Sequence, residues 1–277
     1  MKIGFSTQEI IRPNVLSSLT ALKDYGFDSL QFNMLTVSEK ELPDEIPDSI
    51  IDEVISAKKT TGQSIEAING TFNMIDVDIK SRNRGIENFK KIAAVCKPFD
   101  CKLITLCTGS RNQDSMWKAH PDNQSADAWK DLLHTTEKLL EIAEQFDVSL
   151  GIETEYSNVI NTPERAVMYI KEMRSDRMKI VMDCANLFHP GMAKPDKVRD
   201  VMQHGFDLLG DYVELAHGKD ICAGDGIQFV AAGLGIIDFK FFKKKLDEIN
   251  YKGSIILHGF KTESQIAQSV AFLKRVI

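Results

Sequence analysis

Apolar and polar positions along the chain follow two alternating patterns. Short apolar runs rich in β-branched residues recur eight times, and most of the segments between them carry apolar residues at helical spacing. The eight runs are KIGFS, DSLQF, SIEAI, KLITLC, VSLGIE, KIVMD, YVELAH and GSIILH. Strands that alternate with helices indicate a parallel sheet whose strands are joined by crossover helices.

The helical periodicity is clearest in two segments. The predicted helix over residues 136–148 has five apolar residues on one face: Leu139, Leu140, Ile142, Ala143 and Phe146. The predicted helix over residues 49–59 has four: Ile50, Ile51, Val54 and Ile55. A third helix is expected to begin at Pro163, because Thr162 is a good capping residue and proline suits the first helical turn.

Eight strand–helix units in about 250 residues are typical of a closed (β/α)8 barrel. We therefore predict an α/β fold of the TIM-barrel type, with eight parallel strands inside and helices outside. An open, doubly wound sheet is the alternative, and it often begins with a glycine-rich first turn. The turn after the first run, STQEIIRPN, has no glycine. No linker or change of composition divides the chain, so residues 1–277 are expected to form a single TIM-barrel domain.

Composition and charge narrow the function classes. Apolar residues make up 43% of the chain and charged residues 27%, as in ordinary globular proteins. The 34 Lys and Arg residues against 40 Asp and Glu residues give a net charge of −6. A duplex nucleic-acid binder usually has a basic surplus, because phosphate contacts supply much of its affinity. Nucleic acid is thus a disfavoured partner.

The chain carries no membrane or export signal that we recognise. No stretch reaches the roughly 18 apolar residues of a membrane span, and the first ten residues do not resemble a signal peptide. The five cysteines have spacings that match no zinc or redox motif, which favours reduced thiols and a cytoplasmic location. A homo-oligomer is possible, but no interface is recognisable in the residues.

Four strands in succession end in an ionisable residue: Glu153, Asp183, His217 and His258. In a (β/α)8 barrel the reacting groups lie at the carboxyl ends of the strands. Carboxylates and imidazoles are ligands for Mn²⁺, Co²⁺, Fe²⁺ or Zn²⁺, and a site with open positions would also polarise a substrate oxygen. Each residue alone has an ordinary structural reading, such as a helix cap, an ion pair or a hydrogen-bonded core histidine. Together they predict a divalent metal ion as cofactor.

The stretch from Cys107 to Ala126 is long for a loop between a strand and a helix, and long loops are often functional. It carries Arg111, Trp117 and His120, which could close over a substrate or belong to an ordinary surface loop. The glycines of residues 224–235 offer turns that could hold a phosphate, although loop geometry alone also explains them. Whether a substrate is phosphorylated stays open.

Several segments resemble the xylose-isomerase-like TIM barrels, a superfamily of sugar phosphate isomerases and epimerases that also includes endonuclease IV. They are AINGTFNM, VSLGIETE, VMDCANLF, VELAHGKD and GLGIIDFKFF with INYKGSIIL, and the resemblance extends over essentially the whole chain. It implies metal ligation by Glu153, Asp183 and His217. The fourth ligand of the isomerases and epimerases is usually a glutamate that closes strand eight.

His258 stands at that fourth position, which is the main departure from the family pattern. In the epimerases the two glutamates also act as the acid and the base. Here Glu153 would be the base, and His258 could ligate the metal, act as the second acid or base, or support a different reaction. Substrate contacts are predicted for seven residues: Asn69, Arg111, Trp117, His120, Glu155, Asn186 and Lys219. For Lys219, a plain surface position is the alternative.

Three functions remain open. The first is a metal-dependent isomerase or epimerase acting on a small sugar, sugar phosphate or polyol through an enediolate-type proton transfer. The second is another metal-assisted reaction on the same barrel: hydrolysis, dehydration or phosphodiester cleavage. Endonuclease IV uses a richer histidine set for three zinc ions, whereas Asn69 and Cys107 occupy the early positions here. The third is a non-catalytic sugar-binding relative.

Overall fold

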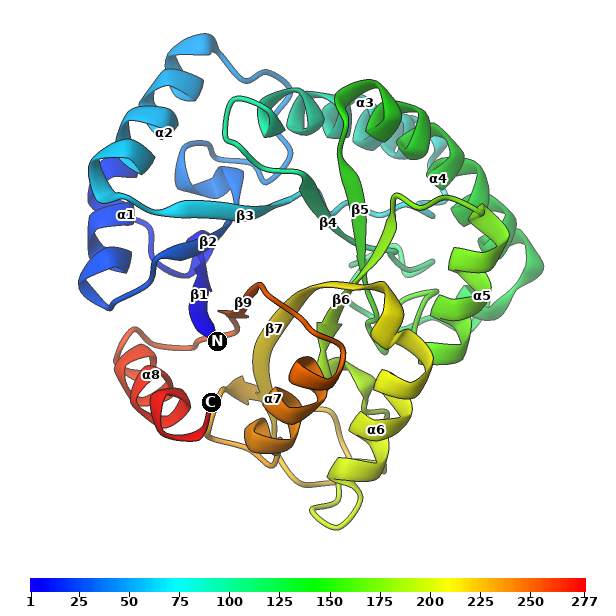
Figure 1. Cartoon of the computed structure of the whole chain (residues 1–277). Coiled ribbons are helices and arrows are strands. Elements are labelled where there is room, and N and C mark those ends of the chain that lie inside the picture. The colour runs from blue at the N-terminus through cyan, green and yellow to red at the C-terminus, as the bar shows by residue number, and fades with distance from the viewer.

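The computed structural model describes residues 1–277 and contains a closed barrel of parallel strands surrounded by helices (Figure 1). The strands are β1 Lys2–Ser6, β2 Ser29–Phe32, β3 Ser64–Asn69, β4 Leu103–Cys107, β5 Ser149–Glu153, β6 Met178–Asp183, β7 Val213–Ile221, β8 Phe229–Ala231 and β9 Ser254–Leu257. The main helices are α1 Val15–Asp24, α2 Asp48–Thr61, α3 Ile79–Cys96, α4 Ala126–Phe146, α5 Pro163–Met173, α6 Val198–Leu209, α7 Phe239–Glu248 and α8 Ser264–Val276.

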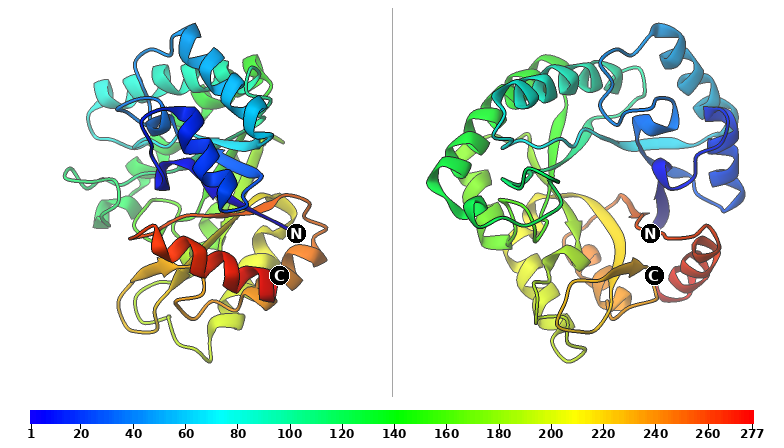
Figure 2. Two further views of the ribbon diagram at one scale, coloured as in Figure 1. Left: turned by 90° about the vertical axis from the view of Figure 1, so that its left-hand side faces the viewer. Right: turned by 180° about the vertical axis from the view of Figure 1, so that it is seen from behind.

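Eight parallel strands close the barrel in the order β1 to β7 and then β9, which pairs with β1. All eight runs predicted as strands are barrel strands, so the barrel prediction is confirmed. The short β8 lies outside this count, since it pairs antiparallel with the end of β7. Seen from the side and from behind, both termini lie close together where β1 meets α8 (Figure 2).

The predicted helices form, with one difference in the buried face. Thr162 caps α5 by accepting a hydrogen bond from the Arg165 backbone N–H, and Pro163 is the first residue of that helix, as predicted. The segment 136–148 lies mostly within α4, which buries Leu139, Ile142 and Ala143 of the expected face, whereas Leu140 and Phe146 are partly buried. In α2, however, Ala57 is buried beside Val54, whereas Ile55 is exposed, because it lies a quarter turn from the contact line.

The apolar core has two parts, one on each face of the barrel strands. A large apolar cluster fills the space between barrel and helices. Five residues fill the inside of the barrel: Ala67, Leu103, Val181, Leu215 and Ile256. Successive side chains of a strand alternate between faces, so the residues two positions further on also point inward. Those residues are Asn69, Thr105, Asp183, His217 and His258, which form a polar layer above an apolar floor.

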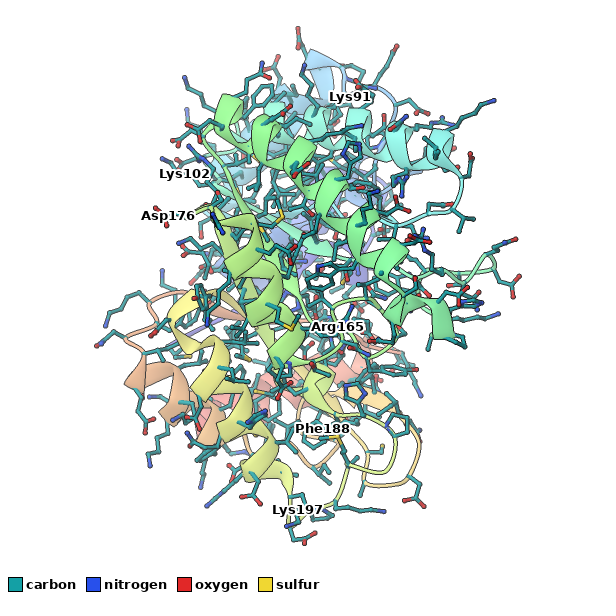
Figure 3. The ribbon with its side chains drawn as sticks, turned by 90° about the vertical axis from the view of Figure 1, so that its right-hand side faces the viewer. Lys91, Lys102, Arg165, Asp176, Phe188 and Lys197 are labelled. Carbon is teal, nitrogen blue, oxygen red and sulfur yellow. The ribbon has the colours of Figure 1, made fainter.

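Figure 3 shows the two ends of the barrel from the side. Lys102 and Asp176 precede β4 and β6 and lie toward one end, whereas Arg165, near the start of α5, lies farther from that end. The polar layer therefore opens at the carboxyl ends of the strands, where the loops are longest. None of the helices combines the length and the apolar character that crossing a bilayer requires.

Candidate functional site

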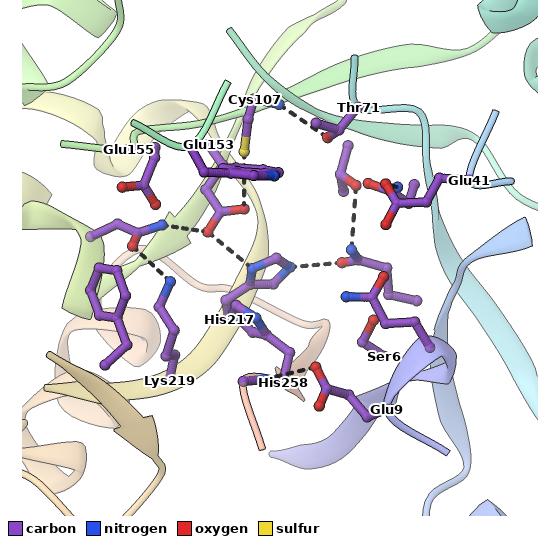
Figure 4. A pocket seen from close by; sticks show the side chains of 18 of the residues that line it. Ser6, Glu9, Glu41, Thr71, Cys107, Glu153, Glu155, His217, Lys219 and His258 are labelled. Carbon is purple, nitrogen blue, oxygen red and sulfur yellow. Dashed lines mark hydrogen bonds and ion pairs between the residues drawn. The ribbon is translucent and has the colours of Figure 1, made fainter. Parts of the chain in front are cut away.

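A cavity of about 480 Å³ opens at the carboxyl ends of the strands (Figure 4). Glu153, His217 and His258 line its base and Asp183 is fully buried beside them, and each of the four offers a ligand atom within 4.8 Å of the other three. A metal ion with bonds of roughly 2.0–2.2 Å places its ligands no further than about 4.4 Å apart, so this cluster is close to the required size. The two carboxylates also supply the charge that offsets a divalent cation. The buried cluster therefore suits a metal site.

Asp183 is held from three sides at the end of β6. Its Oδ1 accepts a hydrogen bond from the Ala185 backbone N–H at 2.9 Å, which begins the short helix after the strand. Its Oδ2 lies 3.0 Å from His258 Nε2 and 3.3 Å from Lys219 Nζ. Burial opposes ionisation, but the Lys219 charge and the His258 contact outweigh it and hold the pKa of Asp183 well below its usual range.

The two carboxylate oxygens of Glu153 have different surroundings. Oε1 accepts a hydrogen bond from Asn186 Nδ2 at 2.7 Å and lies 3.3 Å from His217 Nδ1. Oε2 has only the Cys107 thiol, 3.9 Å away, as a polar neighbour. Burial raises the pKa of Glu153, yet the charge and hydrogen bond of His217 outweigh burial and lower it overall. Glu153 is thus an ionised carboxylate with one fixed and one available oxygen.

His217 is oriented from the opposite side of the barrel. Its Nε2 donates a hydrogen bond to Gln31 Oε1 at 2.7 Å, which leaves Nδ1 as the nitrogen that faces Glu153 and that a metal ion could bind in place of a proton. A histidine whose second nitrogen donates to a fixed acceptor is the usual arrangement around metal sites. In Figure 4 dashed lines join the imidazole of His217 to Glu153 on one side and to Gln31 on the other.

His258 faces the same cluster from the end of β9. Its ring centre lies 4.5 Å from that of His217. Burial and the neighbouring His217 charge lower the pKa of His258, and they outweigh the opposing effect of Asp183. A neutral imidazole is the form that ligates a metal. The residue that departs from the family pattern thus has the position and the protonation state of a ligand.

Lys219 lies two residues beyond His217 and is almost fully buried. Its Nζ donates to Asn186 Oδ1 at 2.7 Å and lies 4.0 Å from the ring centre of Phe229. Burial lowers the pKa of Lys219, but Asp183, Glu153 and Glu155 outweigh it and raise the pKa overall. The prediction that Lys219 belongs to the site agrees with this position, and the plain surface alternative does not.

Four further residues predicted to contact substrate line the same cavity: Asn69, Trp117, Glu155 and Asn186. Trp117 stays 50% exposed at the rim, where Asn158 Nδ2 holds its loop through the Met116 carbonyl oxygen. Glu155 is buried, which raises the pKa of its carboxyl group. These side chains come from the segments at and after the ends of β3, β4, β5 and β6.

Arg111 and His120 do not reach this cavity. The Arg111 guanidinium turns toward α4, where it pairs with Asp131 at 2.7 Å and donates to the Ile75 carbonyl oxygen. His120 Nδ1 accepts a hydrogen bond from the Asp122 backbone N–H and caps the turn before α4. The loop from Cys107 to Ala126 brings Trp117 to the site, but its charged residues serve the loop itself.

The glycine turns after β7 are occupied from within the chain. The Asp220 carboxylate accepts hydrogen bonds from the backbone N–H groups of Gly233, Gly235 and Ile237 at 2.9–3.0 Å. A Cβ at Gly235 would lie 2.3 Å from the Ile221 carbonyl oxygen, so this turn requires glycine. The amides of Gly233 and Gly235 therefore hold Asp220 rather than a phosphate.

Apart from Asn69, the wall built by β1 to β4 was not predicted from the sequence. It carries neutral polar groups, with Ser6, Gln31, Thr71 and Thr105 in the cavity lining, and two carboxylates nearer the rim, Glu9 and Glu41. Gln31 and Thr105 point inward by the same alternation that places the ligand cluster. Their inward position in a strand was the available signal, but neutral residue types do not stand out in a sequence.

Comparison with known proteins identifies the family. The family model described as xylose isomerase-like TIM barrel matches residues 19–276, so the chain belongs to that family. Inosose dehydratase of Glaesserella parasuis serovar 5 (strain SH0165) is 24% identical over 223 residues, which cover 75% of this chain and 74% of that protein.

Solved structures share the fold at low sequence identity. The apo form of 3-keto-D-glucoside 4-epimerase from E. coli has a TM-score of 0.75 and 21% identity, with 99% of both chains covered. The IolI protein with a bound zinc atom has a TM-score of 0.71 and 19% identity, with 100% of this chain and 96% of that chain covered.

Proposed function

We propose that this protein is a divalent-metal-dependent isomerase or epimerase of a small sugar or related polyol that contains a carbonyl group. The observation that carries the proposal is the cluster of Glu153, Asp183, His217 and His258 at the base of the cavity, with ligand atoms within 4.8 Å of one another. Similarity to a sugar epimerase and to inosose dehydratase supports this substrate class.

The donor set favours Mn²⁺, Co²⁺, Fe²⁺ or Zn²⁺, since two imidazoles and two carboxylates suit all four ions. When bound, such an ion polarises the substrate carbonyl group and makes the neighbouring C–H bond more acidic. His217 would ligate through Nδ1 and His258 through Nε2, the nitrogens that face the carboxylates of the cluster. The zinc atom in the IolI protein, a similar fold, agrees with this choice.

Glu153 is the proposed base. Oε1 is held by Asn186, whereas Oε2 is free to accept a proton from the substrate carbon. His258 is the proposed second proton carrier, because Asp183 engages its Nε2 and its Nδ1 makes no hydrogen bond within the protein. Asn69, Glu155, Asn186 and Lys219 would hydrogen-bond substrate hydroxyl groups, and Trp117 would cover the apolar face of the ring.

Dehydration is the second candidate reaction. In that reaction Glu153 would take the proton from the carbon beside the carbonyl group, and a hydroxyl group on the next carbon would leave as water with a proton from Lys219 or His258. The replacement of the glutamate that usually ends the last barrel strand by His258 favours it, because the cluster then offers one free carboxylate oxygen as the base, with the Lys219 ammonium group nearby as the acid. Similarity to inosose dehydratase points the same way.

The test is to incubate the metal-loaded chain with a panel of ketoses, aldoses and inososes in D₂O. Isomerisation or epimerisation predicts products of unchanged composition that carry one deuterium at the reacting carbon. Dehydration predicts products lighter by one water. If neither product forms with any member of the panel, although the compounds bind, the non-catalytic alternative replaces this proposal.

A further inference from the structure

We propose that Glu9 is a positioning residue that holds His258 in place for metal binding, an inference that rests on the metal site of the proposed function. Glu9 accepts two backbone hydrogen bonds directly after His258. Its Oε1 lies 2.9 Å from the Gly259 nitrogen, and its Oε2 lies 3.1 Å from the Phe260 nitrogen. One carboxylate thus fixes both peptide groups that follow the imidazole. Figure 4 shows Glu9 beside His258.

Glu9 is itself well anchored. It ends the short helix Thr7–Glu9, which follows β1, the strand that pairs with β9. Thr7 Oγ1 contacts Thr36 Oγ1 at 2.7 Å and accepts a hydrogen bond from the Asn33 backbone N–H. These contacts join the short helix to the segment after β2. They therefore fix the backbone at Glu9, from which the carboxylate extends to the end of β9.

The turn after His258 needs such an anchor. Gly259 has a φ of +79°, a conformation that glycine adopts readily because it has no Cβ. The same freedom would let the chain rotate at the end of β9. The His258 side chain makes one hydrogen bond of its own, to Asp183 at 3.0 Å. The two bonds from Glu9 therefore restrict a turn that is otherwise free to move.

The position of the turn after His258 is important because the proposed metal ligand is an imidazole. A carboxylate can bind a metal with either of two oxygens and tolerates rotation, whereas an imidazole nitrogen has a single lone pair in the plane of its ring. A histidine at the end of β9 must therefore be oriented more accurately than the glutamate that usually stands there in the family. Groups that orient metal ligands typically change metal affinity by 10–100-fold when they are removed.

The experiment compares Glu9→Gln with Glu41→Gln in the full chain. Both residues line the cavity and both changes remove one negative charge, but Glu41 accepts only from Asn69 Nδ2, at 3.3 Å. A glutamine at position 9 would turn one NH₂ group toward a backbone N–H, so one of the two bonds is lost. Affinity for Co²⁺ is measured on metal-free protein by competition with a chromophoric chelator, without substrate. We expect Glu9→Gln to weaken binding about tenfold and Glu41→Gln less than about twofold.

A double-mutant cycle identifies the route of the effect. If Glu9 acts through His258, Glu9→Gln should add no further loss of Co²⁺ affinity to a His258→Ala chain. An equal loss in both backgrounds, or an equal effect of Glu41→Gln, would overturn the proposal in favour of a general charge effect. Glu9→Asp keeps the charge and shortens the reach, so it should also weaken binding, and it substitutes for Glu9→Gln if that variant does not fold.

A metal-independent measurement separates this inference from the proposed function. The ¹⁵N chemical shifts of the His258 ring in metal-free protein report its hydrogen bond to Asp183. They should change in Glu9→Gln and stay unchanged in Glu41→Gln. A wild-type chain that binds no Co²⁺ would refute the metal site, while these shifts would still decide whether Glu9 positions the ring.

Discussion

The two walls of the cavity differ in their chemistry. The wall from β5, β6, β7 and β9 brings the ionisable groups together, with Glu153, Asp183, His217 and His258 in mutual contact range. At its base the wall from β1 to β4 carries amide and hydroxyl groups, such as Gln31 and Thr105. Carboxylates and imidazoles suit a metal cation, whereas neutral amide and hydroxyl groups suit the hydroxyl groups of a ligand. The two walls therefore differ in what they can bind: a metal ion on the charged wall, and uncharged polar groups of a ligand on the other.

The largest expected effect comes from the charged wall. Glu153→Gln keeps the size and polarity of the side chain but removes the base, so kcat should fall by about 10²–10⁴-fold. Steady-state kinetics on the substrate found in the panel would measure it. An activity within threefold of wild type, roughly 0.7 kcal/mol in the barrier, would mean that Glu153 moves no proton.

Gln31 tests whether the two walls are independent, because it lies in the neutral wall and contacts His217 in the other. Gln31→Leu removes the acceptor for His217 Nε2, so metal affinity should fall by about 10–100-fold. Thr105→Val is the matched control, since it removes only the 3.4 Å contact between Thr105 and Gln31. Competition with a chromophoric chelator measures the metal affinity of both variants. Equal effects would show that Gln31 does not orient His217.

A smaller effect is expected for Asn69, which belongs to the neutral wall and contacts no residue of the ligand cluster. Asn69→Ala removes one hydrogen-bonding group, worth about 0.5–1.5 kcal/mol, so KM should rise roughly two- to twelvefold. Metal affinity should stay within about twofold of the wild-type value. A fall in metal affinity instead would place Asn69 with the charged wall.

The smallest effect is expected outside both walls. His120 caps a turn in the loop before α4 and is exposed to solvent. His120→Ala should therefore leave kcat and KM within about twofold of wild type, with the loss confined to a small decrease in stability of about 1 kcal/mol or less. Kinetics and thermal unfolding check the two parts. A tenfold rise in KM would show that the loop brings His120 over the substrate.

The charged wall was predictable because buried ionisable residues are unusual at the ends of apolar runs. Asp183, His217 and His258 follow their apolar neighbours Val181, Leu215 and Ile256 by two positions, so the strand period alone places them on one level. Gln31 and Thr105 point inward by the same alternation of side chains, but amides and hydroxyl groups occur in many structural settings and do not indicate a site.

Long-range contacts explain the other differences. Arg111 turned away because Asp131, twenty residues further along the chain, attracts it more strongly than the open cavity does. Glu9 is joined to the turn after His258 across 250 residues, a contact that only barrel closure creates. Spacing along a chain predicts which elements form, but not which side chains meet across them.

The central claim is that the charged wall holds a metal ion, and the metal content per chain tests it most directly. The protein is purified without chelator and measured by elemental analysis, then stripped and exposed in turn to Mn²⁺, Co²⁺ and Zn²⁺. We predict about one ion per chain in wild type and a clear loss in His258→Ala. A wild-type chain that carries no metal and takes up none of the three ions would contradict the account.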